Sequence, residues 1–99
     1  MRNENFRAKA NRAWDAAITL CKLMKKGDKL HQKVAVRAIR TQHGEEFIYQ
    51  NRHANPAINR HVLSLFEMFT EEKIVWAKHG HYWRWRRPGD PADGREVIF

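Results

Sequence analysis

The sequence predicts an α+β fold in which three or four helices are followed by a C-terminal two-stranded β-hairpin. Two observations indicate it. Apolar residues recur at helical spacing over roughly the first 70 residues, and the period then changes to alternation over residues 73–87. A chain of 99 residues suits one domain, and 42% hydrophobic residues are too many for a disordered tail. We expect the domain to span residues 1–87 and residues 88–99 to form a loosely ordered tail.

The first helix is expected from about Asn5 to Lys26. One helical face carries apolar residues at the i, i+3, i+4 positions: Phe6, Ala10, Ala13, Trp14, Ala17, Ile18, Cys21 and Met24. Gly27 follows as the expected left-handed terminating residue. Leu20 and Leu23 widen the apolar arc beyond one packing face, so either another part of the chain or a second subunit covers this end.

The second helix is expected from about Leu30 to His43, where Gly44 ends it. Its two faces are an apolar one with Leu30, Val34, Ala35, Ala38 and Ile39 and a basic one with Lys33, Arg37 and Arg40. The stretch Glu45 to Asn51 fits either one helical turn or a short strand, and we favour the helix.

The third helix is expected to begin at Asn55, because Asn is a good N-cap and Pro56 then occupies the first helical position, where its missing N–H costs nothing. Apolar residues follow at helical spacing: Ile58, Val62, Leu65, Phe66 and Phe69. The helix should end near Glu71.

A hairpin is expected over Lys73 to Arg87, with His79 and Gly80 at its tip and Gly80 supplying the positive φ of the turn. This register places five residue pairs opposite each other: Lys78 with His81, Ala77 with Tyr82, Trp76 with Trp83, Val75 with Arg84, and Ile74 with Trp85. One face is then wholly apolar, with Ile74, Trp76, Trp83 and Trp85, while the other carries Arg84 and Arg86. In the tail, Val97-Ile98-Phe99 could dock on the domain.

The charge of the chain favours a polyanionic partner. Lys and Arg number 19 against 11 Asp and Glu, a net charge of +8, and the excess is concentrated in residues 1–43 and 73–87. The single cysteine, Cys21, cannot form an internal disulfide or a thiolate metal cage. With no signal peptide and no long apolar run, we expect a cytoplasmic protein, associated with the nucleoid if bacterial or from a phage.

In element order, and most specifically over Asn55 to Arg87, the chain resembles the winged helix-turn-helix superfamily. There a capped helix ending in acidic residues leads into a basic hairpin with Gly at its tip. The resemblance implies double-stranded DNA binding by a recognition helix at about residues 56–71 and a wing at 73–87, in a small transcriptional regulator or architectural DNA binder. The gap from Gly44 to Asn55 is longer than the usual turn, so either Glu45 to Asn51 is the positioning helix or the motif carries an insertion.

On this interpretation, two sets of residues contact DNA. The recognition-helix set is Asn55, Ala57, Asn59, Arg60, His61 and Ser64, and the wing set is Lys78, His79, His81, Tyr82, Arg84 and Arg86. Asn59 could pair with adenine and Arg60 with guanine, because each side chain matches the base edge in the major groove. A wing with five positive charges and no acid suits phosphate contacts.

Other chemistries have weaker signals. His79 and His81 have no third ligand at matching spacing, so we expect no metal and no other cofactor. The tryptophans are expected in the core rather than stacked on bases. No nucleophile with a base and no glycine-rich phosphate loop is recognisable, which argues against an enzyme.

Two partner hypotheses remain beside DNA. A protein-interaction winged-helix module could dock on an acidic partner and act as an adaptor or inhibitor of a larger machine. A homodimer through the first helix would cover Leu20 and Leu23 and read two half-sites about one helical turn apart.

Overall fold

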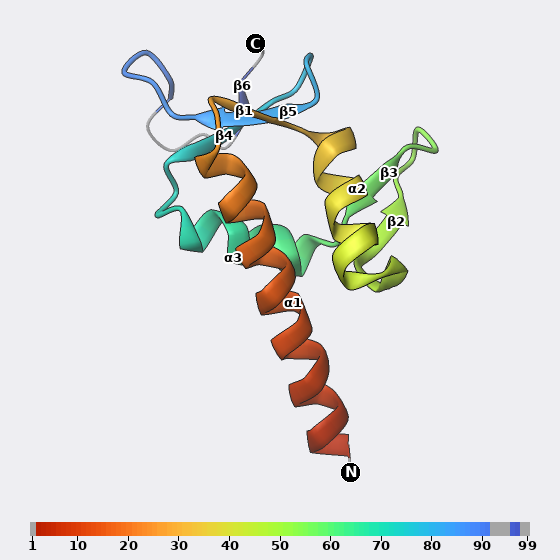
Figure 1. The fold of residues 1–99 in the computed structure, drawn as a ribbon. Coiled ribbons are helices and arrows are strands. Elements are labelled where there is room, and N and C mark those ends of the chain that lie inside the picture. The colour runs from red at the N-terminus through yellow and green to blue at the C-terminus, as the bar shows by residue number, and fades with distance from the viewer. Residues whose placement is uncertain (1, 92–95, 98–99) are drawn as a thin grey trace.

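The computed structural model describes residues 2–91 and 96–97, with side chains from residue 10 onward. The described residues form three α-helices, a four-stranded sheet and a two-stranded sheet, which confirms the α+β class; Figure 1 shows how they are arranged. In chain order the elements are α1 (Arg2–Lys25), β1 (Lys29–His31), α2 (Gln32–His43), the 3₁₀ helix η1 (Glu45–Phe47), β2 (Ile48–Gln50), β3 (Pro56–Ile58), α3 (Arg60–Phe69), β4 (Ile74–Ala77), β5 (Tyr82–Trp85) and β6 (Glu96–Val97).

The long helix α1 packs against α2 and α3 with its C-terminal half, while its N-terminal half projects from the body (Figure 1). Leu20 is fully buried and Leu23 packs against the core, so the chain itself covers the wide apolar arc. Among the glycines that the structure describes, only Gly44 has a positive φ, at 83°. The expected left-handed conformation at Gly27 is therefore wrong, whereas Gly44 ends α2 as expected.

Strand β1 occupies the place where the sequence predicts the start of the second helix. Leu30 is buried while Lys29 and His31 are exposed, and the three residues pair antiparallel with β5. Three residues are too few to display a strand period, and the pairing partner lies about fifty positions away, so the local pattern favoured a helix. The helix begins at Gln32 instead, and Val34, expected on its apolar face, is 50% exposed.

A second hairpin, β2–β3, replaces both the helix expected over residues 45–51 and the helix start expected at Asn55. The Asn51 carboxamide oxygen accepts hydrogen bonds from the backbone N–H groups of His53 and Asn55, which holds the connecting loop. Pro56 pairs with Gln50 at the edge of this two-stranded sheet, a position where a missing N–H is tolerated.

The N-cap of α3 is Asn59 rather than Asn55. The Asn59 Oδ1 accepts from the backbone N–H of His61 at 2.8 Å and of Val62 at 3.4 Å. From this start the helix buries Val62 and Phe66 against the core. The sequence therefore placed the start of the helix four residues too early, because Asn55-Pro56 is also a good start signal.

We expect Asn59→Ala to lower the free energy of unfolding by about 1 kcal/mol, because α3 loses its N-cap. Asn59→Asp should retain stability, since a carboxylate accepts the same N–H groups and suits the positive end of the helix. Asn55→Ala is the matched control and should change stability by less than about 0.5 kcal/mol. Urea unfolding measures all three. A larger loss in Asn55→Ala than in Asn59→Ala would contradict this start of the helix.

The β4–β5 hairpin has the register that the sequence predicts, with Trp76 opposite Trp83 and Ile74 opposite Trp85. The strand order in the four-stranded sheet is β1-β5-β4-β6. In the tip, the positive φ belongs to His81, at 55°, and not to Gly80. Position 80 favours glycine for reasons of space, because a Cβ there would collide with the ring of Tyr82.

The two faces of this sheet are both covered. The predicted apolar face packs on the core, where the Trp83 ring meets the Phe66 ring edge-on at 5.8 Å between centroids. On the other face, Arg84 is only 2% exposed and its guanidinium binds the Asp90 carboxylate at 2.8 and 2.9 Å. The expectation that Arg84 lies on an exposed basic face is therefore wrong.

The C-terminal segment, expected to be loose, is tied to the sheet at both described places. Residues 88–91 form a turn whose Asp90 binds Arg84 and the backbone N–H of Arg87, and β6 pairs in parallel with β4. Ile98 and Phe99, which the sequence suggests could dock, lie outside the described residues. Contacts with the four-stranded sheet thus continue past Arg87.

Asp90 makes stability dependent on pH in the acid range. Hydrogen bonds from the Arg84 guanidinium, and then from the Arg87 N–H, hold the pKa of this carboxyl far below its usual range. A lowered folded-state pKa contributes stability above the unfolded pKa of about 4 and loses it as the pH falls further. The urea midpoint of the wild type should therefore fall more steeply below about pH 4 than that of Asp90→Asn. Parallel curves for the two proteins would contradict it.

Candidate nucleic-acid interface

The structure separates the residues that the sequence assigns to a recognition helix. Asn55 lies in the β2–β3 loop, Ala57 is buried in β3, and the Asn59 oxygen is occupied as the α3 cap. Adenine pairing would need that oxygen, so Asn59 is a structural residue in this fold. Three residues of the predicted recognition-helix set do lie on α3 with exposed side chains: Arg60, His61 and Ser64.

The exposed side of α3 becomes acidic towards its C-terminus. Glu67 lies on the helix, and Glu71 and Glu72 follow it; these three line one shallow hollow together with Ser64. A groove of DNA would bring phosphates close to these carboxylates. The electrostatics of α3 therefore disfavour it as the helix that enters a groove.

The wing residues divide into an exposed tip and a structural base. Lys78, His79 and His81 are exposed at the tip. Tyr82 is half-buried between the His31 ring and the Lys29 ammonium, which lies 4.7 Å above the Tyr82 ring.

Arg86, like Arg84, belongs to the base of the wing. It donates to the backbone oxygens of Glu72 and Pro91. The tip is thus the part of the wing set whose side chains are exposed in this structure.

Basic side chains gather instead on α2. Lys33, Arg37 and Arg40 are exposed and share one face at helical spacing, and Arg40 also pairs with Glu45 at 2.6 Å. The sequence shows this face as basic, but none of its three residues was among the predicted site residues. The signal that could have found it is the excess of basic residues in the first 43 positions.

Two basic hairpin tips lie beside the start of α2 at the same end of the molecule (Figure 1). One is the β2–β3 loop with exposed Arg52 and His53, and the other is the β4–β5 tip. We call the combination the α2 surface; it comprises Lys33, Arg37, Arg40, Arg52, His53, Lys78, His79 and His81. Glu45 is the one acid that pairs with it among the described ion pairs.

A cavity of about 680 Å³ lies within the α2 surface, between α2, the start of β3 and the β4–β5 tip. Gln32 holds these parts together: its backbone N–H donates to His81 O at 2.9 Å, and its Nε2 donates to Pro56 O at 2.8 Å. Arg37 and Lys33 line the same cavity. The arrangement offers a concave, positively charged site with a fixed outline.

Comparison with known proteins identifies the family but no activity. The chain belongs to DUF6953, a family of unknown function, whose model matches residues 12–85. No curated protein matches the chain, and no solved structure does. The matched range contains α2, both hairpins and the whole α2 surface.

The described residues contain no group of three or more His, Cys, Asp or Glu side chains placed to hold a metal ion. Their helices include none with the length and apolar character needed to cross a membrane.

Proposed function

We propose that this protein binds double-stranded DNA through the α2 surface, as a small transcriptional regulator or architectural DNA binder. The observation that supports this most is the basic face of α2 between two basic hairpin tips. An α-helix fits the major groove, and protruding tips reach the phosphates on either side of it. The proposal retains the polyanionic partner expected from the sequence and moves the contact from α3 to α2.

Arg37 is placed to do more than bind phosphate. It lies on the exposed face of α2 near Val34, which is 50% exposed despite being apolar. Arginine pairs with the guanine edge, and an apolar side chain suits the thymine methyl group. Lys33 and the hairpin tips then supply the sequence-independent phosphate contacts.

We also propose that the fold is a winged helix with an insertion. The helices α1, α2 and α3 precede the β4–β5 hairpin in the expected order, and β1, between the first two helices, pairs with β5. The β2–β3 hairpin lies between α2 and α3 and accounts for the long gap in the motif. On this assignment the insertion carries one of the two tips that flank α2.

Binding to random duplex DNA at increasing salt tests the function. Each neutralised phosphate contributes about −0.9 to the slope of log K against log salt, so several contacts should weaken binding steeply between roughly 50 and 200 mM. A protein adaptor that docks on an acidic partner should bind duplex too weakly to measure. The absence of duplex binding would therefore reject the DNA proposal and favour the adaptor.

A homodimer through α1 stays a prediction. The apolar surface at Leu20 and Leu23 no longer supports it, because both side chains pack within the chain. Trp14, expected in the core, is 48% exposed but packs its ring against Phe69 at 4.6 Å between centroids. Sedimentation at micromolar concentration decides it, since a species of 11.8 kDa is a monomer.

A further inference from the structure

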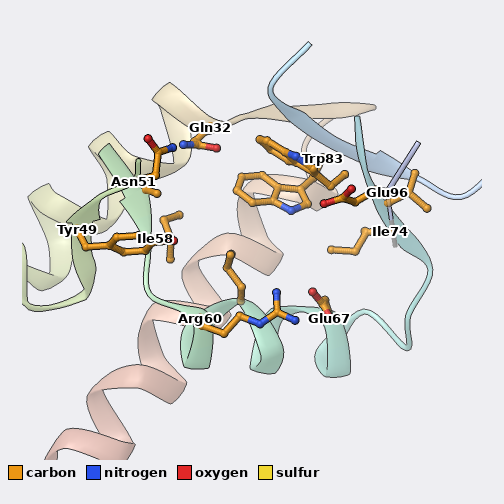
Figure 2. A pocket seen from close by; sticks show the side chains of 13 residues that line it. Gln32, Tyr49, Asn51, Ile58, Arg60, Glu67, Ile74, Trp83 and Glu96 are labelled. Atoms are coloured by element: carbon orange, nitrogen blue, oxygen red, sulfur yellow. The ribbon is translucent and has the colours of Figure 1, made fainter. Parts of the chain in front are cut away.

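A second cavity, of about 580 Å³, lies between α3, the β2–β3 hairpin and the four-stranded sheet (Figure 2). Its volume is within the range of sites that hold small organic ligands. Trp83, Ile74 and Ile58 line it with apolar surface, and Trp76 packs beside Trp83 with 4.7 Å between ring centroids. We call it the Trp83 cavity. A flat, aromatic ligand suits such a lining because it can stack on indole rings.

Two carboxamides at one end of the Trp83 cavity have orientations that their backbone partners determine (Figure 2). Asn51 Oδ1 accepts two backbone N–H groups, so the Asn51 amide nitrogen remains as a donor. Gln32 Nε2 donates to Pro56 O, so the Gln32 oxygen remains as an acceptor. Among the described residues neither remaining atom has a hydrogen-bond partner. A donor and an acceptor fixed near each other match the edge of a nucleobase, which offers both.

The charged side chains around the Trp83 cavity limit the charge that a ligand inside it can have. Arg60 supplies one positive charge, while Glu67 and Glu96 supply two carboxylates. This balance opposes a chain of phosphates inside the cavity. A base with its sugar is acceptable there, and any phosphate would have to lie outside.

The Trp83 cavity adjoins the α2 surface through Gln32, which lines both cavities. A nucleotide with its base in the Trp83 cavity could thus keep its phosphate among the basic residues. We propose that the Trp83 cavity binds a nucleobase, supplied either by a free nucleoside or by an unpaired nucleotide of a bound nucleic acid.

The first arm of the test uses the four common ribonucleosides. Each is titrated to millimolar concentration while tryptophan fluorescence and heat are measured. At least one should bind saturably and quench the fluorescence. Asn51→Asp should weaken it about tenfold, because Asp keeps the oxygen that holds the loop and loses the donor. Gln50→Glu is the matched control, because it makes the same change from amide to carboxylate at the neighbouring exposed position of β2, outside the lining of both cavities, and it should bind as the wild type does.

The second arm compares a fully paired duplex with the same duplex carrying one unpaired nucleotide. If the base comes from nucleic acid, the second duplex should bind about tenfold more tightly, and Asn51→Asp should abolish this preference while Gln50→Glu retains it. The proposal is overturned if neither arm shows binding that depends on Asn51. It stands apart from the proposed function, because steep salt dependence on the paired duplex could persist without either effect.

Discussion

Arg84→Ala is expected to lower the free energy of unfolding by about 3 kcal/mol, because removing one partner of a buried ion pair leaves the other without compensation. Arg84 is 2% exposed and its guanidinium makes two hydrogen bonds to Asp90 and one to Trp85 O. The substitution also leaves a cavity beneath residues 88–91. Urea unfolding at neutral pH measures the loss.

Arg87→Ala is the matched control, since Arg87 is exposed and contributes its backbone N–H to Asp90. It should change stability by less than about 0.5 kcal/mol. Arg84→Lys should lie between the two, because an ammonium retains the charge but cannot form the paired bonds to one carboxylate. Equal stability of Arg84→Ala and Arg87→Ala would show that the ion pair contributes little.

The second large effect is expected in DNA binding. The double variant Lys33→Ala, Arg37→Ala should weaken binding to every duplex and flatten the salt slope by about one to two units, because Lys33 loses a phosphate contact and Arg37 loses a second positive charge close to the DNA. The reason is that both side chains are exposed on the α2 face and line the α2 cavity. Fluorescence anisotropy with random duplex at several salt concentrations measures it.

Lys22→Ala with Lys25→Ala is the matched control, because these exposed lysines lie near the end of α1, outside the α2 surface. This pair should leave the slope nearly unchanged. A third variant, Arg60→Ala, separates α2 from the helix that the sequence favoured. If Arg60→Ala flattens the slope and the α2 variant does not, DNA lies against α3 instead.

The sequence predicted correctly those elements whose contacts lie between residues close together in the chain. The β4–β5 register is one example: the strands are adjacent in sequence, and pairing Trp76 with Trp83 makes one face apolar. The strands β1 and β6 were missed because they are only three and two residues long and pair with distant partners. At the start of α3, two good N-caps compete, and the β2–β3 pairing selects Asn59 over Asn55.

The sequence and the structure point to different helices for the proposed DNA contact: the sequence favoured α3, whereas the basic side chains gather on α2. The basic excess was visible in the composition, yet a count of charges does not say which charges meet in space. The resemblance drew attention to the third helix, where Glu67 and the two acids after it oppose a phosphate backbone. The buried ion pair of Arg84 could not be predicted for a similar reason: its partner Asp90 lies in a segment without a periodic pattern, so the sequence did not indicate that the two residues meet.

The double link at Gln32 has a mechanical consequence. One residue at the first position of α2 joins the β4–β5 tip through its backbone and β3 through its side chain, so the separation of the two tips is set before any ligand arrives. Two hairpin tips that are held at a fixed separation lose little conformational entropy when a ligand binds. If the α2 surface binds DNA as proposed, two tips at a fixed separation would favour duplex of one groove width, and other sequences would have to deform to fit.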